Sequence, residues 1–491
     1  MSASALSAQG VSIVSVPLHS NAQPLQRIRL TVEEAVRRGV EYSKTLHTAQ
    51  AKLHAAEARV GEAAVAMLPK VDVTATYARL SDIPLDRQFQ FQLDVSQFFR
   101  GTVDPMLLAD PSVQRSLLAL RQLTTPPPSS GEQPQPSSVF PVILDNYQFQ
   151  AAVTYPVFTG FRLEAAKAAA EYNAQAASQD IMKERSETEF TIHNAYWTLY
   201  KVRHVQRLTA ETIEQVNARL ADAQSLLKNG LLTQNDILRL QLQLSNAKIA
   251  KIDADNAERL AALQLNTLLG LPLHAEVELA SEIQYTPNKL PDYETALQRA
   301  LEARAEVRGT QLRIKAAEEA VRAARGGYFP TVAISGAALE ANPNPRLSWR
   351  GAEWNFTWQL AAQLSWTLWN WNTTGYQVAQ AEAQVVQAED ALSMLHDGIK
   401  LEVTQNYLAL QQAREKVAVA QQGMEQANEN YRVTNEKFKK GLALTSDVTE
   451  AQTLQLQAKV HYITSIVDYE LAQARLAKSL GERSPLINQA K

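Results

Sequence analysis

The chain of 491 residues is built from two copies of one unit. A shift of 211 residues places Gly230-Leu231 on Gly441-Leu442 and Leu269-Gly270 on Leu480-Gly481. A shift of 261 residues aligns the earlier part of each half, where Ala55-Ala56-Glu57 falls on Ala316-Ala317-Glu318. Self-similarity at a fixed spacing is the signature of a repeated architecture, so any fold proposed for this chain must be buildable twice.

The duplication predicts the domain organisation. We expect the first repeat at 25–272 and the second at 291–483, joined by a linker at 273–290. The two shifts differ because the first repeat carries a long insertion at 81–146, which is rich in Pro, Ser and Gln near its end and is typical of an irregular exposed loop. Terminal tails are expected at 1–24, predicted to be disordered, and at 484–491.

Each repeat is predicted to contain one very long helix, at 161–228 and at 376–440. About 65 residues at 1.5 Å per residue span roughly 100 Å, far more than a globular domain uses. Such helices need partners along their whole length, and inner positions spaced three and four apart predict coiled-coil packing. These positions are Ile213, Val216, Leu220, Ala223 and Leu227, and Met424, Ala427, Tyr431, Thr434 and Phe438. Shorter single helices are predicted at 31–67 and 292–328, each ending before a proline.

Four segments alternate apolar and polar residues with a period of two, which predicts strands. They run over 71–77, 148–155, 331–339 and 356–368. A sheet with one face in water would explain this pattern, but the helices are already committed to one another and leave its apolar face uncovered. A transmembrane barrel explains it better, because lipid-facing strands carry aromatic girdles. The girdle candidates are Tyr77, Tyr155, Phe356, Trp358, Trp366 and Trp369.

Four strands cannot close a barrel, since unpaired edges are not tolerated in lipid. The sequence therefore predicts an oligomer in which each chain supplies four strands. The alternative is a soluble coiled-coil scaffold with a small sheet domain. Fractionation distinguishes the two, because only the channel partitions into an outer membrane.

Together these features resemble the TolC-type outer-membrane efflux and secretion channels. The resemblance covers roughly 25–483 and rests on Tyr155-Pro156-Val157-Phe158-Thr159-Gly160, the Gly-Leu breaks at 230 and 441, and the Leu-Gly ends at 269 and 480. It implies a mainly helical fold with a small β part: a homotrimer with a 12-stranded barrel and a helical tunnel. It further implies an outer-membrane location with a long periplasmic extension, a periplasmic adaptor, and an inner-membrane pump of RND, ABC or MFS type.

The resemblance also assigns site residues. The hairpin tips that would dock the adaptor are Gly230, Leu231, Leu232, Gly441, Leu442 and Ala443, and the leucines exposed there favour a docking role. Asp447 and Glu450 match an acidic ring at the tunnel mouth, which would favour cations. Asp236 matches a gate partner, whereas Phe438 and Ala443 lack the hydroxyl and the positive charge found in well-known members. Thr233 or Asn235, and Ser446, are the expected helix caps.

Composition narrows the function further. The chain has no cysteine, so thiolate chemistry, iron–sulfur clusters and Cys-zinc sites are excluded. Its eight histidines show no metal-ligand spacing, and neither a phosphate-binding loop nor a nucleophile elbow occurs. A formal net charge of −3 does not indicate a nucleic-acid partner. We therefore expect neither an enzyme nor a cofactor.

Overall fold

The computed structural model describes residues 28–81, 143–283, 285, 290–347 and 351–482. The predicted tails at 1–24 and 484–491 and nearly all of the 81–146 insertion lie outside these ranges. The described chain separates into a helical unit and a sheet unit, and both halves of the sequence contribute to each.

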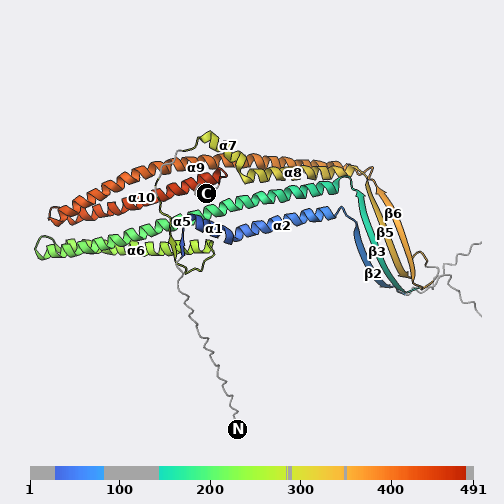
Figure 1. Ribbon diagram of the computed structural model, residues 1–491, viewed down its shortest axis with the longest axis horizontal. Helices are drawn as coiled ribbons and strands as arrows, with labels where there is room; N and C mark the ends of the chain where they lie inside the picture. Colours follow the sequence, from blue (N-terminus) through green and yellow to red (C-terminus); the bar gives the residue numbers. More distant parts are fainter. Residues whose placement is uncertain (1–27, 82–142, 284, 286–289, 348–350, 483–491) are drawn as a thin grey trace, which may run out of the picture. The chain divides into compact units, whose positions relative to one another are not determined.

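Two hairpins of long helices dominate the helical unit (Figure 1). In the first, α5 (Arg162–Lys228) turns back into α6 (Gln234–Leu268), and in the second, α9 (Thr373–Lys439) turns back into α10 (Thr445–Ser479). α5 and α9 each have 67 residues, and α6 and α10 each have 35. The second pair begins 211 residues after the first, so the helices recur at the spacing read from the sequence.

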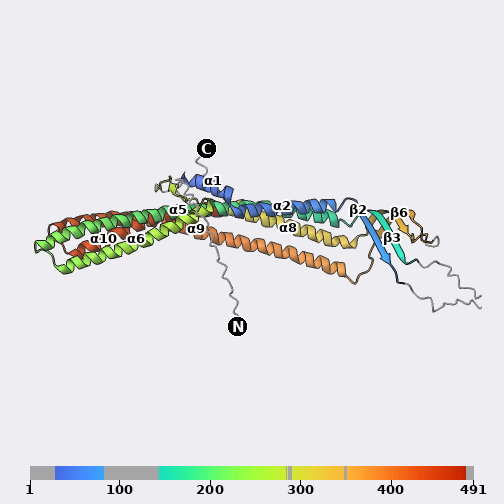
Figure 2. The same ribbon diagram turned by 90° about the horizontal axis from the view of Figure 1, so that it is seen from below.

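The predicted inner positions of the long helices lie on their packed sides. Val216, Ala223 and Phe438 are buried, and the other positions of the two series are partly buried. α5 packs against α6 and α10, and α9 packs against α10 (Figure 2). Lateral contact of this kind supplies the stability that a lone helix in water lacks.

The shorter helices differ from the prediction, because each is broken once. The first consists of α1 (Val32–Tyr42) and α2 (Lys44–Val65), and the second of α7 (Tyr293–Ala303) and α8 (Ala305–Arg325). At the first break, Ser43 Oγ accepts a hydrogen bond from the Leu46 backbone N–H at 3.2 Å and starts a new helix. Both breaks occur without proline, so the rule used on the sequence did not detect them.

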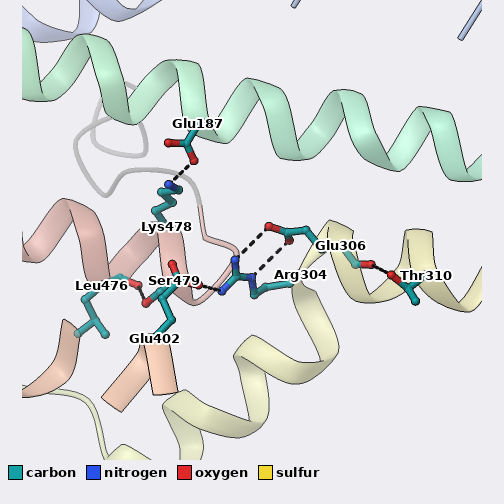
Figure 3. Close-up of polar contacts among 8 residues, drawn as sticks. All are labelled: Glu187, Arg304, Glu306, Thr310, Glu402, Leu476, Lys478 and Ser479. Carbon is teal, nitrogen blue, oxygen red and sulfur yellow. Dashed lines mark hydrogen bonds and ion pairs between the residues drawn. The ribbon is translucent and has the colours of Figure 1, made fainter. Parts of the chain in front are cut away.

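The second break is at Arg304, whose backbone is extended. Figure 3 shows its buried guanidinium between two carboxylates from different helices. The Arg304 side chain donates to Glu306 at 3.0 Å and to Glu402 on α9 at 2.5 Å. Ion pairing in this buried setting ties the break to α9, which explains why a long, charged residue occupies it.

A short parallel pair, β1 (Ile28–Leu30) and β4 (Val277–Leu279), lies beside α1 and was not predicted. Leu30 of β1 and Val277 of β4 belong to the same hydrophobic core cluster as Tyr196 on α5. The Tyr196 hydroxyl donates a hydrogen bond to the Leu30 carbonyl at 3.0 Å. The expected linker at 273–290 therefore contains one strand of this pair.

The sheet unit is a single antiparallel sheet in the order β2-β3-β5-β6. Its strands are β2 (Lys70–Arg79), β3 (Asp145–Phe158), β5 (Thr331–Asn342) and β6 (Asn355–Ser365). All four predicted strands are confirmed, although β6 ends at Ser365, so Trp366 lies just beyond it. β2 and β6 each pair on one side only, and nearly all of their residues are exposed.

Candidate functional site: hairpin tips and an amphipathic sheet

The turn between α5 and α6 is a glycine-dependent helix end. Gly230 has φ +77°, the left-handed region that side chains disfavour. Its N–H donates to the Leu227 carbonyl at 2.9 Å, and the Leu231 N–H donates to the Leu226 carbonyl at 2.9 Å. This pair of bonds is the Schellman motif, which satisfies carbonyls left open at a helix end.

The turn between α9 and α10 repeats this geometry. Gly441 has φ +70°, and the N–H groups of Gly441 and Leu442 bond the Phe438 and Lys437 carbonyls at 2.9 Å each. The two helix ends thus share one backbone conformation, the Schellman motif, at positions 211 residues apart.

The six tip residues assigned from the sequence do not share one environment. Leu231 is 66% exposed and Leu442 is 73% exposed, whereas Leu232 and Ala443 pack against a buried cluster. Leu444, 68% exposed, was not predicted as part of the tip. The outward apolar surface of the two tips therefore consists of Leu231, Leu442 and Leu444.

The acidic residues lie in the first turns of the returning helices. Asp236 faces Thr233, the N-cap of α6, and hydrogen bonds from the Thr233 side chain and backbone hold the pKa of this carboxyl below its ordinary value. The expected cap at Ser446 is wrong, because α10 begins at Thr445 and Ser446 lies inside its first turn. The Asp447 carboxylate instead accepts the Leu444 N–H at 3.2 Å.

Glu450 is exposed one turn further along α10 and lines a groove of about 610 Å³ between α6 and α10. The groove also contains Arg239 and Gln243 from α6. Asp447 and Glu450 thus share one end of one helix, and both reach solvent in the single chain.

Phe438 does not face solvent. It is 1% exposed and packs with Ala223, Ile237, Leu240 and Val448 where the two hairpins meet. The ring therefore contributes to the packing that holds the hairpin ends together. A tyrosine hydroxyl at this buried place would need a partner, which explains how the position accepts phenylalanine.

A buried arginine that the sequence analysis did not identify links three of the long helices. Arg219 on α5 is 3% exposed, and its guanidinium donates to Gln452 Oε1 on α10 at 2.5 Å and to the Tyr431 hydroxyl on α9 at 2.8 Å. Gln452 also accepts from Gln243 Nε2 on α6 at 3.1 Å, so the network reaches all four helices. We call this group the Arg219 clasp. The heptad analysis of the sequence considered mainly apolar positions, so it did not identify this polar group.

The sheet has two chemically different faces. The cross-strand registers bring the odd-numbered residues of β2 and β3 together with the even-numbered residues of β5 and β6. One row thus runs Val73, Ala151, Ala338, Trp358, and the next runs Val71, Val153, Gly336, Leu360. The opposite face carries Thr74, Gln150, Leu339 and Thr357 in one row and is otherwise mainly polar. We call these the apolar face and the polar face.

Aromatic residues gather on the apolar face toward the ends of the strands. Tyr77 and Tyr147 have ring centroids 5.0 Å apart, and Trp354, which was not predicted, lies 5.8 Å from Tyr147. Phe356 pairs in register with Glu340, in the row that includes Phe149. Of the other girdle candidates, Tyr155 lies toward the opposite end of the sheet, Trp366 follows β6, and Trp369 belongs to the helical unit, where it contacts Trp371.

Among the helices that the structure describes, none is both long and apolar enough to cross a membrane. The described ranges also contain no group of three or more acidic or histidine side chains arranged to hold a metal ion.

Comparison with protein families decides the identity of the chain. The family model described as outer membrane efflux protein matches residues 109–271 and 296–482, which is well over half of the sequence. The chain belongs to the outer membrane efflux protein family. The match falls in two segments, one in each half of the duplicated sequence.

Relatives and solved structures agree with this assignment. The outer membrane efflux protein BepC of Brucella suis is 22% identical over 325 residues, covering 66% of this chain and 70% of BepC. The CmeC outer membrane channel of Campylobacter jejuni matches with a TM-score of 0.70 and 13% identity, covering 93% of this chain and 88% of CmeC. VceC of Vibrio cholerae matches with a TM-score of 0.68 and 16% identity, covering 92% of this chain and 96% of VceC. The outer membrane efflux fold is therefore shared despite low identity.

Proposed function

We propose that this outer membrane efflux protein is a homotrimeric exit channel of a tripartite efflux or type I secretion system. The observation that carries the proposal is a four-stranded sheet with two open edges and an exposed apolar face. Three copies would close a 12-stranded barrel, with the apolar face toward lipid and the polar face toward water. Within its unit, no described element covers the apolar face, which argues against a soluble scaffold.

The helical unit supports the same assembly. α6 carries exposed Leu238, Leu242, Ile249 and Ile252, and α9 carries exposed Met394, Leu401 and Leu408. Exposing apolar stripes of this length to water is energetically unfavourable. Because the two stripes lie on different hairpins, the α6 stripe of one copy could pack against the α9 stripe of the next. The result would be a helical tunnel that continues the barrel on the periplasmic side.

The tips suit docking to a periplasmic adaptor protein. Leu231, Leu442 and Leu444 project from rigid turns, so burying them against a partner would cost little conformational entropy. Energy would come from an inner-membrane pump of RND, ABC or MFS type, and the channel itself would be passive. Small molecules, ions and polypeptides are all compatible with an open duct.

Asp447 and Glu450 would form the acidic ring of the periplasmic mouth, six carboxylates from three chains. Like charges at such a constriction attract cations. The Arg219 clasp holds the two hairpins of one chain together next to this mouth, so we assign it the task of keeping the hairpin ends closed.

The experiment is purification in detergent followed by planar-bilayer recording. We expect a heat-modifiable trimer in the outer-membrane fraction and cation-selective channels. The double variant Asp447→Asn with Glu450→Gln should lose most of this selectivity, while the pair Glu429→Gln and Glu436→Gln, exposed carboxylates on α9, serves as a charge-matched control. A monomer that stays soluble without detergent would reject the channel, and unchanged selectivity in the double variant would reject the acidic ring.

A further inference from the structure

The loop that joins β5 to β6 is anchored by a buried asparagine. Asn344 is 0% exposed, and its side-chain amide donates to the Asn355 carbonyl at 2.8 Å and to Thr357 Oγ1 at 3.1 Å. Its Oδ1 accepts the Arg346 N–H at 3.0 Å. Both N–H groups and the oxygen of this amide are thus engaged, and they hold the start of the loop against the next strand.

These bonds place Asn344 and Arg346 beside the polar face. Thr357 and Gln359 belong to that face, since they alternate with Phe356 and Trp358 on the apolar one. The Arg346 guanidinium donates to the Gln359 side-chain oxygen and to the Trp358 carbonyl, the latter at 3.1 Å. Arg346 therefore lies across the polar face, at the end of the sheet where β5 and β6 are joined.

Arg346 is conspicuous on this face because the face is nearly uncharged. Its strand residues are mainly Thr, Gln, Ser, Asn and Ala, and only Lys70 and Asp72 carry charge. Those two pair with each other at 2.9 Å. No carboxylate in the described part of the chain forms an ion pair with Arg346, so its positive charge is uncompensated there.

From this geometry we propose that Arg346 is a fixed positive charge inside the lumen that binds anionic groups near the outer mouth of the channel. The inference rests on the proposed function, since it takes the polar face to line the lumen. Three copies would place three guanidinium groups around one end of the barrel. Rings of arginine or lysine favour anions, and guanidinium offers paired donors to carboxylate, phosphate and sulfonate oxygens.

The site would complement the acidic mouth at the hairpin tips. Cargo would meet carboxylates at the hairpin tips and guanidinium groups in the barrel, whose polar face is otherwise almost uncharged. A charge of this kind changes the local concentration of permeating ions and is screened by salt. Its effect is therefore greatest at low ionic strength.

The test is the reversal potential of the purified full-length trimer in planar bilayers, under a potassium chloride gradient at low salt. Arg346→Gln should raise the cation-to-anion permeability ratio by about twofold or more, because it removes a ring of positive charge that favours anions. Gln359→Glu should give the same direction of change, because it sets a carboxylate beside Arg346 without altering the anchor of the loop. This second variant keeps the test valid even if Arg346→Gln assembles poorly.

The matched control is Arg79→Gln. Arg79 lies on β2 in the register of the apolar face, and its guanidinium pairs with Asp145 at 3.9 Å, so its removal should leave the permeability ratio unchanged. Channels with wild-type ratios in both Arg346→Gln and Gln359→Glu would overturn the inference while leaving the channel intact. Failure of the wild-type protein to form channels would instead overturn the proposed function, and this inference with it.

Discussion

At the scale of single residues, the most consequential side chains are buried polar ones. Arg219 is almost fully buried, has no carboxylate among its hydrogen-bond partners, and leaves its Nε without a partner in the described structure. Burial lowers the pKa of this guanidinium. The Tyr431 ring also lies 5.5 Å from this guanidinium, so Arg219 depends on groups that α9 and α10 supply.

Tyr431→Phe should weaken the Arg219 clasp without changing the shape of the core. The variant removes one of two acceptors of a buried cation, so we expect local destabilisation of about 1–3 kcal/mol. Hydrogen exchange of backbone amides at the ends of α5 and α9 measures it. Tyr407→Phe is the control, because the Tyr407 hydroxyl lies on the same helix and bonds the exposed Pro291 carbonyl at 3.3 Å. Equal exchange in the two variants would contradict a clasp.

Glu470 on α10 gives a pH prediction. Burial raises the pKa of this carboxyl from 4.5 to about 7. Between these values the unfolded chain has lost the proton and the folded chain keeps it, so the free energy of unfolding falls as pH rises from 4.5 to 7. Glu470→Gln should remove this dependence and stabilise the protein at pH 8, by up to about 3 kcal/mol.

The measurement is the denaturation midpoint of the detergent-solubilised protein from pH 4 to 8. The exposed neighbour Asp468→Asn controls for the loss of a carboxylate on the same helix. A slope that persists in Glu470→Gln would show that another group is responsible.

At the scale of elements, the sheet has an apolar face and a polar face, which we propose meet lipid and water. Leu360 and Ala361 are adjacent on β6, both exposed, and in register with residues on opposite faces. Leu360→Lys should therefore cost about 2–4 kcal/mol if its face meets lipid near the middle of the membrane. Ala361→Lys, on the polar face, should be tolerated. The fraction of heat-modifiable trimer after refolding into lipid vesicles compares them, and equal yields would contradict a lipid-facing row.

Elements with regular spacing were predictable from the sequence, and irregular ones were not. Period-two alternation located all four strands, and the duplication located both tips, because each pattern follows directly from backbone geometry. The breaks at Ser43 and Arg304 arise from a local cap and from tertiary ion pairs, neither of which alters periodicity. The Arg219 clasp was missed for a related reason, since its partners lie more than 200 residues away in sequence.

At the scale of the whole molecule, the described part of the chain leaves two strand edges and much apolar surface uncovered. Open strand edges and exposed stripes on α6 and α9 are the surfaces that the proposed trimer would cover. The family to which it belongs is defined by outer membrane efflux, and the assembly we propose explains why so much apolar surface remains uncovered in one chain.

Substitutions in the α6 stripe should weaken this assembly. Leu242→Lys combined with Ile249→Lys removes two apolar contacts that would each contribute about 1.5–3 kcal/mol when buried between copies. We expect a shift from trimer to smaller species on native electrophoresis in detergent. The control combines Gln241→Lys with Lys248→Gln, two exposed positions that each precede a stripe residue in the sequence. This control should leave the trimer intact. Loss of the trimer in both variants, or in neither, would reject the stripe as an interface.

The matched lengths of the paired helices have a mechanical consequence. α5 has as many residues as α9, and α6 has as many as α10. A change in the length of one hairpin would therefore shift its tip along the helix axis relative to the other tip. Removing one heptad from all four helices would retract both tips by about 10 Å while preserving their facing sides. Removing it from one hairpin would misalign the turns. Helix length thus sets how far the tips extend, and a shortened channel would need an adaptor that is longer by the same distance.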